Sequence, residues 1–280
     1  MMMNFDGRMG FRRVIPARKW IGLFRMIIKF RMRFIGLLLA FLALGLPAAH
    51  AGEVLVAVAA NFTAAAQELA DRFHAETGAS VDLSFGSSGQ LYTQITQGAP
   101  YDILLSADAA RPKKAEDEGW GVTGSRFTYA VGKLVLWSAK ADLADSEGAV
   151  LRNGGFTHLA IANPAAAPYG AAAVEVMKAL GVHTSISPKI VQGENIIQTY
   201  QFVASGNADL GFVALSQVLE QPGGSYWRVP ENLHAPILQD AVLLKAGEHN
   251  RFAVAFLDFL KSPQGVSIIA AHGYGTPPGK

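Results

Sequence analysis

The order of apolar and polar positions along the chain predicts short strands that alternate with amphipathic helices. The apolar run Val54–Ala60 is typical of a buried strand. The next stretch, Thr63–Glu76, carries apolar residues at helical spacing and ends just before Gly78, which favours a helix stop there. Ser80–Phe85 alternates apolar and polar positions, which indicates a second strand.

The same pattern continues to the C-terminus and predicts an α/β protein. Further strands are expected at Tyr101–Asp108, Lys133–Ala139, His158–Asn163, Pro188–Gly193, Asp209–Leu215 and Asp240–Ala246. Further helices are expected at residues 90–98 and 110–119 and at Ala171–Leu180, Ile196–Ala204 and Arg251–Leu260. Strands that alternate with helices favour mostly parallel sheets flanked by helices.

The length of the chain favours two lobes joined by a hinge rather than one sheet. We expect residues 52–131 together with 241–280 to form lobe 1, and residues 132–240 to form lobe 2. The chain would return near Asp240, so that the C-terminal helices pack on the first lobe. No linker rich in Gly, Ser or Pro separates the lobes, which predicts short hinge crossings.

The first 51 residues differ from the rest in charge and hydropathy, because they hold nine Lys and Arg residues and a single acid. Arg31 and Arg33 precede the apolar run Phe34–Leu46, which is shorter than the ~20 residues of a membrane-spanning helix. Ala49-His50-Ala51 then fits a small-x-small cleavage site. Residues 1–51 are therefore predicted to be a secretory signal peptide cleaved after Ala51, with a retained N-terminal anchor as the alternative.

Without the leader, the composition indicates an acidic exported protein. Fifteen basic side chains then face twenty-one acidic ones, and an acidic body is repelled by nucleic-acid backbones. The chain has no cysteine, which excludes disulfides, thiol catalysis, Cys-ligated zinc and a lipid tether on an N-terminal Cys. A cleaved, untethered and cysteine-free product indicates the bacterial periplasm.

Motifs of enzyme chemistry are incomplete. Gly119–Gly124 matches G-x-G-x-x-G, but it follows a charged helix and precedes a strand-like segment, the reverse of a dinucleotide site. Gly86–Gly89 resembles a nucleophile elbow, but G-x-S-x-G would require glycine at Gln90. The histidines beyond the leader show no metal-ligand spacing. The sequence therefore predicts neither an enzyme nor a cofactor, and an exported hydrolase that uses Ser88 remains a remote alternative.

Small or polar residues stand four times between a predicted strand and a predicted helix. These turns are Ala60–Thr63, Gly86–Gly89, Pro168–Gly170 and Glu194–Ile196. Helix N-termini present unpaired N–H groups and a positive dipole end, and ligands of open α/β sheets bind at the carboxyl ends of strands. Ordinary capping would explain any one turn. Four of them, two from each lobe, predict an anion site.

At these residues the sequence closely resembles the periplasmic molybdate-binding proteins of ABC transporters. The resemblance runs from Val54 to Tyr274. It is carried by VAANFTAAAQELADRF, SFGSSGQLYTQITQGAPYDILLSAD, IANPAAAPYGAAAVEVMKALG, GENIIQTYQFVASGNADLGFVALSQ and FLKSPQGVSIIAAHGYG. It implies a hinged, two-lobed periplasmic-binding-protein fold that closes on one molybdate or tungstate. It also implies a monomer that serves an inner-membrane permease and its ATPase.

The resemblance also implies which residues bind the oxyanion. They are Asn61, Ser88, Tyr169 and Ile196, with Ala60 and Ser87 in support. Tyr169 and Ile196 would contribute backbone N–H groups, and molybdenum would be present only as molybdate on these same residues. Some members add a tyrosine hydroxyl after Gly-Phe-Val, where this chain has Ala214. We expect the Asn61 side chain or an extra backbone donor to replace it, and we expect Asn61 also to cap its helix.

Neutral donors are chemically sufficient for such a ligand. A dianion can be held without Lys or Arg when every oxygen receives hydrogen bonds at helix N-termini. A protonated phosphate would bring an O–H group without an acceptor, at a cost of roughly 1–3 kcal/mol. Sulfate has the same charge and shape as molybdate but shorter bonds, so its rejection depends on cavity size. A binding protein for sulfate, phosphate or another small oxyanion, and a sensing module without transport, therefore remain alternatives.

Overall fold

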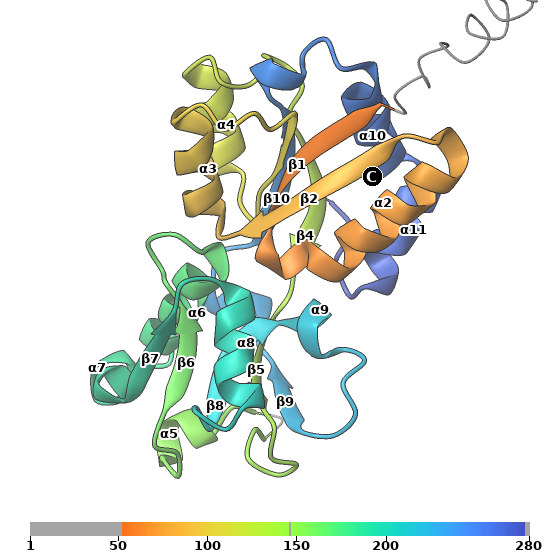
Figure 1. Ribbon diagram of the computed structural model, residues 1–280. Coiled ribbons are helices and arrows are strands. Elements are labelled where there is room, and N and C mark those ends of the chain that lie inside the picture. The colour runs from red at the N-terminus through yellow and green to blue at the C-terminus, as the bar shows by residue number, and fades with distance from the viewer. Residues whose placement is uncertain (1–51, 146, 278–280) are drawn as a thin grey trace, which may run out of the picture. The chain divides into compact units, whose positions relative to one another are not determined.

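The computed structural model describes residues 52–145 and 147–277. The predicted signal peptide, residues 1–51, lies outside the described residues. Two five-stranded sheets organise the described chain, and helices flank both (Figure 1). Each sheet with its helices is called a lobe below, the first lobe being the one that contains the N-terminal strand.

The first sheet has the strand order β2-β1-β3-β10-β4. Its strands are β1 (Glu53–Ala59), β2 (Ser80–Gly86), β3 (Ile103–Leu105), β4 (Phe127–Gly132) and β10 (Ile237–Leu243). Strand β1 pairs in parallel with β2 and β3, while β10 pairs antiparallel with β3 and β4. Four strands therefore run in one direction and β10 alone is reversed.

The second sheet repeats this arrangement with the order β7-β6-β8-β5-β9. Its strands are β5 (Leu134–Ser138), β6 (Leu159–Ala162), β7 (Ile190–Gly193), β8 (Leu210–Ala214) and β9 (Ser225–Arg228). Strand β6 is parallel to β7 and β8, and β5 is antiparallel to β8 and β9. The predicted two-lobed α/β class is confirmed, and both sheets are mixed, because the one reversed strand of each sheet pairs antiparallel with its two neighbours.

Helices cover both faces of each sheet. The first lobe contains α2 (Thr63–Thr77), α3 (Ser88–Thr96), α4 (Ala110–Asp117), α10 (Arg251–Lys261), α11 (Pro263–Ala271), η1 (Ala60–Phe62) and η4 (Lys245–Gly247). The second contains α5 (Val150–Asn153), α6 (Pro168–Ala179), α7 (His183–Ile186), α8 (Ile196–Ala204), α9 (Leu215–Val218), η2 (Ser187–Lys189) and η3 (Glu231–Leu233). Within residues 52–145 and 147–277 no single helix could cross a membrane, although α10 and α11, bent by 65°, pass the length and composition test together.

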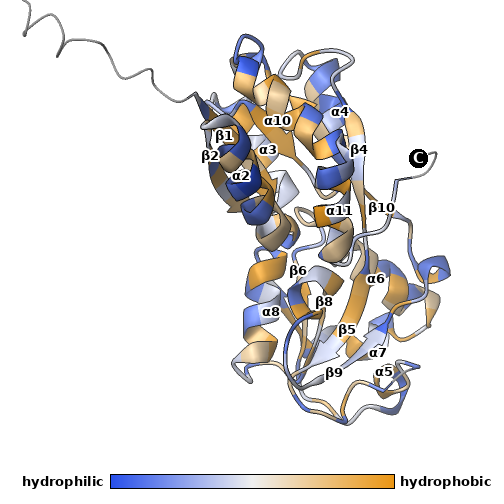
Figure 2. Cartoon of the chain, turned by 90° about the vertical axis from the view of Figure 1, so that its right-hand side faces the viewer, coloured by the Kyte–Doolittle hydropathy of each residue, from blue (hydrophilic) through white to orange (hydrophobic). Residues whose placement is uncertain are grey.

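Strand periodicity determines which helices each sheet face buries. Val56 and Val58 of β1 belong to the core shared with α2, α10 and α11, whereas Ala57 between them packs with α3 and α4. Figure 1 shows α3 and α4 on one side of the first sheet and α2, α10 and α11 on the other. Phe73 and Phe256 meet edge to face at 5.2 Å inside the first core. Figure 2 shows the hydrophobic strand β5 between helices that carry hydrophilic residues.

The chain crosses between the sheets where β4 ends at Gly132 and β5 begins at Leu134, and it returns between β9 and β10. The last strand begins at Ile237, three residues before the strand predicted at Asp240–Ala246. The difference arises because the polar pair Gln239 and Asp240 is fully buried within it. The lobe boundaries given above from sequence stay a prediction.

Candidate functional site

A small cavity, of about 10 Å³, lies at the carboxyl ends of β1, β2, β3, β6 and β7. The residues that line it are Ala59, Ala60, Asn61, Gly86, Ser87, Ser88, Ala107, Ala167, Pro168, Tyr169 and Ile196. All six residues predicted to bind or support the oxyanion are among them. The cavity is far smaller than the neighbouring pockets of 310–880 Å³ and has room for about one water molecule, so a larger ligand requires it to widen.

Asn61 is 4% exposed and lies within η1, immediately after β1. Its Nδ2 donates to Gln239 Oε1 at 3.0 Å and to the Tyr274 hydroxyl at 3.1 Å. The prediction that Asn61 caps the following helix is wrong, because Phe62 is the N-cap of α2 and makes no side-chain cap bond. The extra turn η1 places Asn61 ahead of the cap position and directs its amide toward Gln239.

The first turn of α3 combines a cap with a free hydroxyl donor. Ser87 Oγ accepts from Gln90 N–H at 3.4 Å, and Gln90 Oε1 accepts from Ser87 N–H at 3.3 Å, which forms a capping box. Ser88 is 1% exposed, and its Oγ accepts from Ala107 N–H at 2.9 Å. Among the described residues the Ser88 hydroxyl proton has no acceptor. Ser88 therefore offers an unused O–H donor at the cavity.

Helix α6 begins with a proline, which leaves the next N–H group free. Pro168 occupies the first helical position and has no N–H, while Gly170 N–H is bonded to the Ala167 carbonyl at 2.9 Å. Tyr169 N–H lies between them and has no acceptor among the described residues. The backbone donor predicted at Tyr169 is thus present and unused at the cavity.

Helix α8 achieves the same result with an asparagine cap. Asn195 Oδ1 accepts from the N–H groups of Ile197 and Gln198, both at 3.0 Å. These bonds satisfy the second and third N–H groups of the helix, and Ile196 N–H has no acceptor within the described chain. Gln217 Nε2 donates to the Ile196 carbonyl at 3.0 Å and holds this turn in place.

The site is electrically neutral apart from its helix dipoles. Among the described residues, those that line the cavity include no Lys, Arg, His, Asp or Glu. Burial raises the pKa of the Tyr169 hydroxyl well above its ordinary value, so this group also stays neutral. Three helix N-termini and one hydroxyl donor converge on the cavity, an arrangement that favours a small anion.

Behind the cavity lies a buried polar network that sequence reasoning missed. Gln239 accepts from Tyr129 as well as from Asn61, and Tyr274 donates to the Asn61 carbonyl at 2.6 Å. Ser216 donates to that same carbonyl at 3.0 Å. Polar residues inside the apolar C-terminal strand were the available signal. Only the folded chain shows what they contact, since Gln239 stands 178 positions from Asn61.

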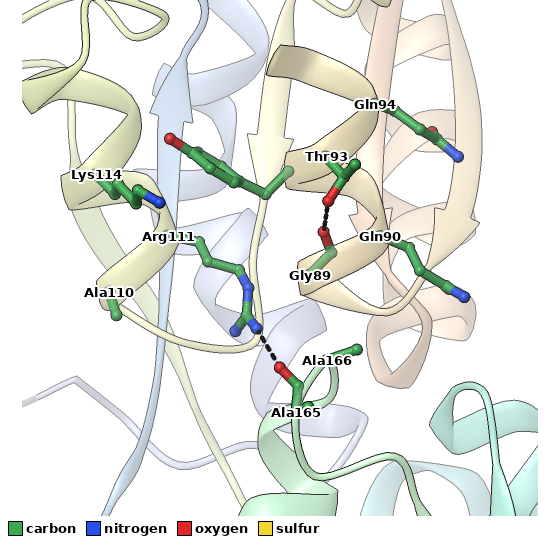
Figure 3. Close-up of a pocket in the computed structure, with 10 residues that line it drawn as sticks. Gly89, Gln90, Thr93, Gln94, Ala110, Arg111, Lys114, Ala165 and Ala166 are labelled. Carbon is green, nitrogen blue, oxygen red and sulfur yellow. Dashed lines mark hydrogen bonds between the residues drawn. The ribbon is translucent and has the colours of Figure 1, made fainter. Parts of the chain in front are cut away.

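A second, larger pocket of about 880 Å³ lies beside the site between α3, α4 and the segment Ala165–Ala166 (Figure 3). Arg111 reaches from α4 and donates through Nη2 to the Ala165 carbonyl at 3.1 Å, while it also pairs with Asp108. Gly89 N–H donates to the Ala166 carbonyl at 2.9 Å. The two lobes therefore contact each other directly next to the candidate site.

Ala214, at the end of β8, stands where the resemblance led us to compare this chain with a tyrosine. Ala214 is fully buried and is not among the residues that line the cavity. The Asn61 amide, which we expected to replace the missing contact, is engaged by Gln239 and Tyr274. An extra backbone donor is the remaining expectation.

Two matching sheets place free helix N-termini around a small neutral cavity, which is an arrangement suited to binding a small solute. The chain belongs to the family of bacterial extracellular solute-binding proteins, which matches residues 54–275. It is 58% identical to the molybdate-binding protein ModA of Rhodobacter capsulatus over 235 residues, or 84% of this chain and 92% of that protein.

Two further comparisons agree. Identity to the molybdate-binding protein ModA of Azotobacter vinelandii is 54% over 231 residues, which cover 81% of this chain and 92% of that protein. The structure of the Azotobacter vinelandii periplasmic molybdate-binding protein superposes with a TM-score of 0.78 at 44% identity, over 80% of this chain and 99% of that chain. The predicted resemblance and the two-lobed periplasmic-binding-protein fold are confirmed. The ligand role of each site residue stays a prediction.

Proposed function

We propose that this protein captures molybdate between its two lobes in the periplasm and delivers it to an ABC permease. The observation that carries the proposal is the convergence of unused neutral donors, from helix starts of both lobes, on one small uncharged cavity. The identity of 54–58% to molybdate-binding proteins supports molybdate as the oxyanion. Tungstate, which has the same charge and tetrahedral shape, would bind in the same way.

In this proposal the ligands are neutral groups. Ser88 would donate its hydroxyl, and Tyr169 and Ile196 would donate backbone N–H groups from the second lobe. Asn61 would contribute its backbone N–H from η1, because its side-chain amide already donates to Gln239 and Tyr274, and Ala60 and Ser87 would support it. Such donors hold a dianion with the help of the helix dipoles, and molybdenum enters only as the ligand itself, without a cofactor.

The proposed lobes are residues 52–131 with 241–280, and residues 132–240, except that all of β10, from Ile237 on, is counted with the first lobe because it is a strand of the first sheet. Because donors come from both, the anion binds the closed form more tightly than the open form and shifts the population toward it. A permease and its ATPase would recognise the closed monomer. The predicted signal peptide, residues 1–51, supports the periplasm as the location of this cycle.

A catalytic role is the weaker candidate. A serine nucleophile needs an adjacent general base, and among the described residues no histidine lines the cavity. Ser88 Oγ accepts a backbone hydrogen bond from Ala107, which leaves its proton available to a ligand. These contacts support binding without turnover.

The test is a calorimetric titration of the chain from Gly52, stripped of bound anion, with molybdate, tungstate, sulfate and phosphate. We expect tight one-to-one binding of molybdate and tungstate and no heat from the other two. A response to sulfate or phosphate alone would mean that the protein binds a different oxyanion. Silence toward all four would overturn the proposal.

A further inference from the structure

The Gln239 side chain joins the two lobes behind the candidate site. It is fully buried on β10, at a register shift between Gln239 and Asp240. Its Oε1 accepts from Asn61 Nδ2 and from the Tyr129 hydroxyl, both at 3.0 Å. Its Nε2 donates to the Tyr169 hydroxyl oxygen at 3.2 Å. The Gln239 amide thus contacts one proposed anion-binding residue of each lobe, Asn61 and Tyr169.

The backbone and the side chain of Tyr169 make contacts in different places. Its backbone N–H faces the cavity as the first free donor of α6. Its phenol, also fully inside the protein, ends at Gln239 in the first sheet. The ring therefore connects the start of α6 rigidly to the first lobe, and the position of the N–H donor depends on this connection.

Gly132 provides the space for this contact. A Cβ atom at this position would lie 2.4 Å from the Tyr169 hydroxyl oxygen and 2.7 Å from Gln239 Nε2, closer than atoms can approach. Gly132 is the last residue of β4 and pairs with Ile237 of β10, directly before the chain crosses to β5. The contact between Gln239 and Tyr169 therefore sits at the crossing between the lobes.

We propose that Gln239 is a positioning residue that couples lobe closure to anion capture, through its hydrogen bond to the Tyr169 hydroxyl. The inference rests on the proposed function. Its bonds to Asn61 and Tyr129 stay within the first lobe and persist when the lobes separate. The bond to Tyr169 joins different lobes, so it forms on closure and brings the Tyr169 N–H donor into place.

Two phenylalanine substitutions separate this role from simple structural support. Tyr169→Phe keeps the ring and the backbone donor but removes the cross-lobe bond. Tyr129→Phe removes a hydroxyl that contacts the same Gln239 oxygen at 3.0 Å but lies outside the cavity lining and wholly in the first lobe. Molybdate affinity and dissociation rate would be measured by calorimetry and stopped-flow for both variants, together with their thermal unfolding midpoints.

We expect Tyr169→Phe to weaken molybdate binding about fivefold to tenfold, the effect of one buried hydrogen bond, with most of the change in the dissociation rate. Tyr129→Phe lowers the unfolding midpoint but changes affinity less than twofold. In a Gln239→Leu background, Tyr169→Phe causes less than a further twofold loss, because the bond is already gone.

Three results would overturn the inference. The first is that Tyr169→Phe binds molybdate as tightly as the wild type. The second is that Tyr129→Phe loses as much affinity as Tyr169→Phe. The third is that the affinity loss of the double variant equals the product of the losses caused by Tyr169→Phe and Gln239→Leu alone. The wild-type titration distinguishes these from failure of the proposed function. A wild type silent to molybdate overturns both, whereas a wild type that binds alongside an equally tight Tyr169→Phe overturns this inference alone.

Discussion

At the scale of single residues, the two serines at the start of α3 divide capping from ligand binding. Ser87 closes the capping box, whereas Ser88 has an unused O–H. We expect Ser88→Ala to weaken molybdate binding at least tenfold, because a hydrogen bond to a charged group is lost. Ser87→Ala should lower the unfolding midpoint and weaken molybdate binding by less than Ser88→Ala does. Calorimetry and thermal unfolding of both variants check this, and equal affinity losses would contradict the division of roles.

A second residue-scale prediction concerns acid stability in the second lobe. The hydrogen bond from Lys140 Nζ at 2.7 Å, helped by Thr157 N–H, lowers the pKa of Asp209 to about 2. Because the folded pKa lies below the unfolded value of about 3.9, the carboxylate stabilises the fold above pH 4 and loses this effect as the pH falls toward 2. Asp209→Asn should therefore lower the unfolding midpoint at pH 7. Unfolding curves measured from pH 7 to pH 2 should show the difference shrink below pH 4, and a constant difference would refute this.

At the scale of elements, α4 contributes a direct contact across the mouth of the site. Arg111 Nη2 donates to the Ala165 carbonyl at 3.1 Å (Figure 3). This bond exists only while the lobes are together, so Arg111→Ala should raise the molybdate dissociation rate about twofold to fivefold. Lys113→Ala is the matched control, since Lys113 lies on the same helix in an exposed pair with Asp117. Stopped-flow release should separate the variants, and identical rates would exclude a role for Arg111.

The N-termini of helices were also the feature that the sequence predicted best. A polar or small residue after an apolar run indicates a helix N-terminus, and all six residues chosen this way, with the help of the family resemblance, line one cavity. The extra turn η1 escaped the pattern, because Asn61 before Phe62-Thr63 satisfies the same local rule as an N-cap. Gln239 escaped it because its partners come from three other segments, and local periodicity carries no information about such contacts.

At the scale of the whole molecule, the two sheets share one pattern of strand directions, in which the fourth strand across the sheet is reversed. The lobes touch on both sides of the site. Gly89 and Arg111 contact Ala166 and Ala165 on one side, and Ser216 contacts the Asn61 carbonyl on the other. Opening of the lobes, as proposed above, would break all of these contacts together. We therefore expect closure to be cooperative, and a small ligand that adds bonds to both lobes would shift the balance toward the closed form.

Gly132 tests this cooperativity at the crossing. A methyl group there would lie 2.4 Å from the Tyr169 hydroxyl oxygen, so Gly132→Ala should disfavour the closed form and weaken molybdate binding tenfold or more, in proportion to the lost closed population. Gly78→Ala is the control, since Gly78 ends α2 at φ 74° with no atom within 4 Å of an added Cβ. It should lower stability by about 1 kcal/mol and leave affinity unchanged. Small-angle scattering at saturating molybdate should show the control compacting like the wild type, while Gly132→Ala stays expanded until far more ligand is added. If Gly132→Ala compacts and binds normally, the crossing does not control closure.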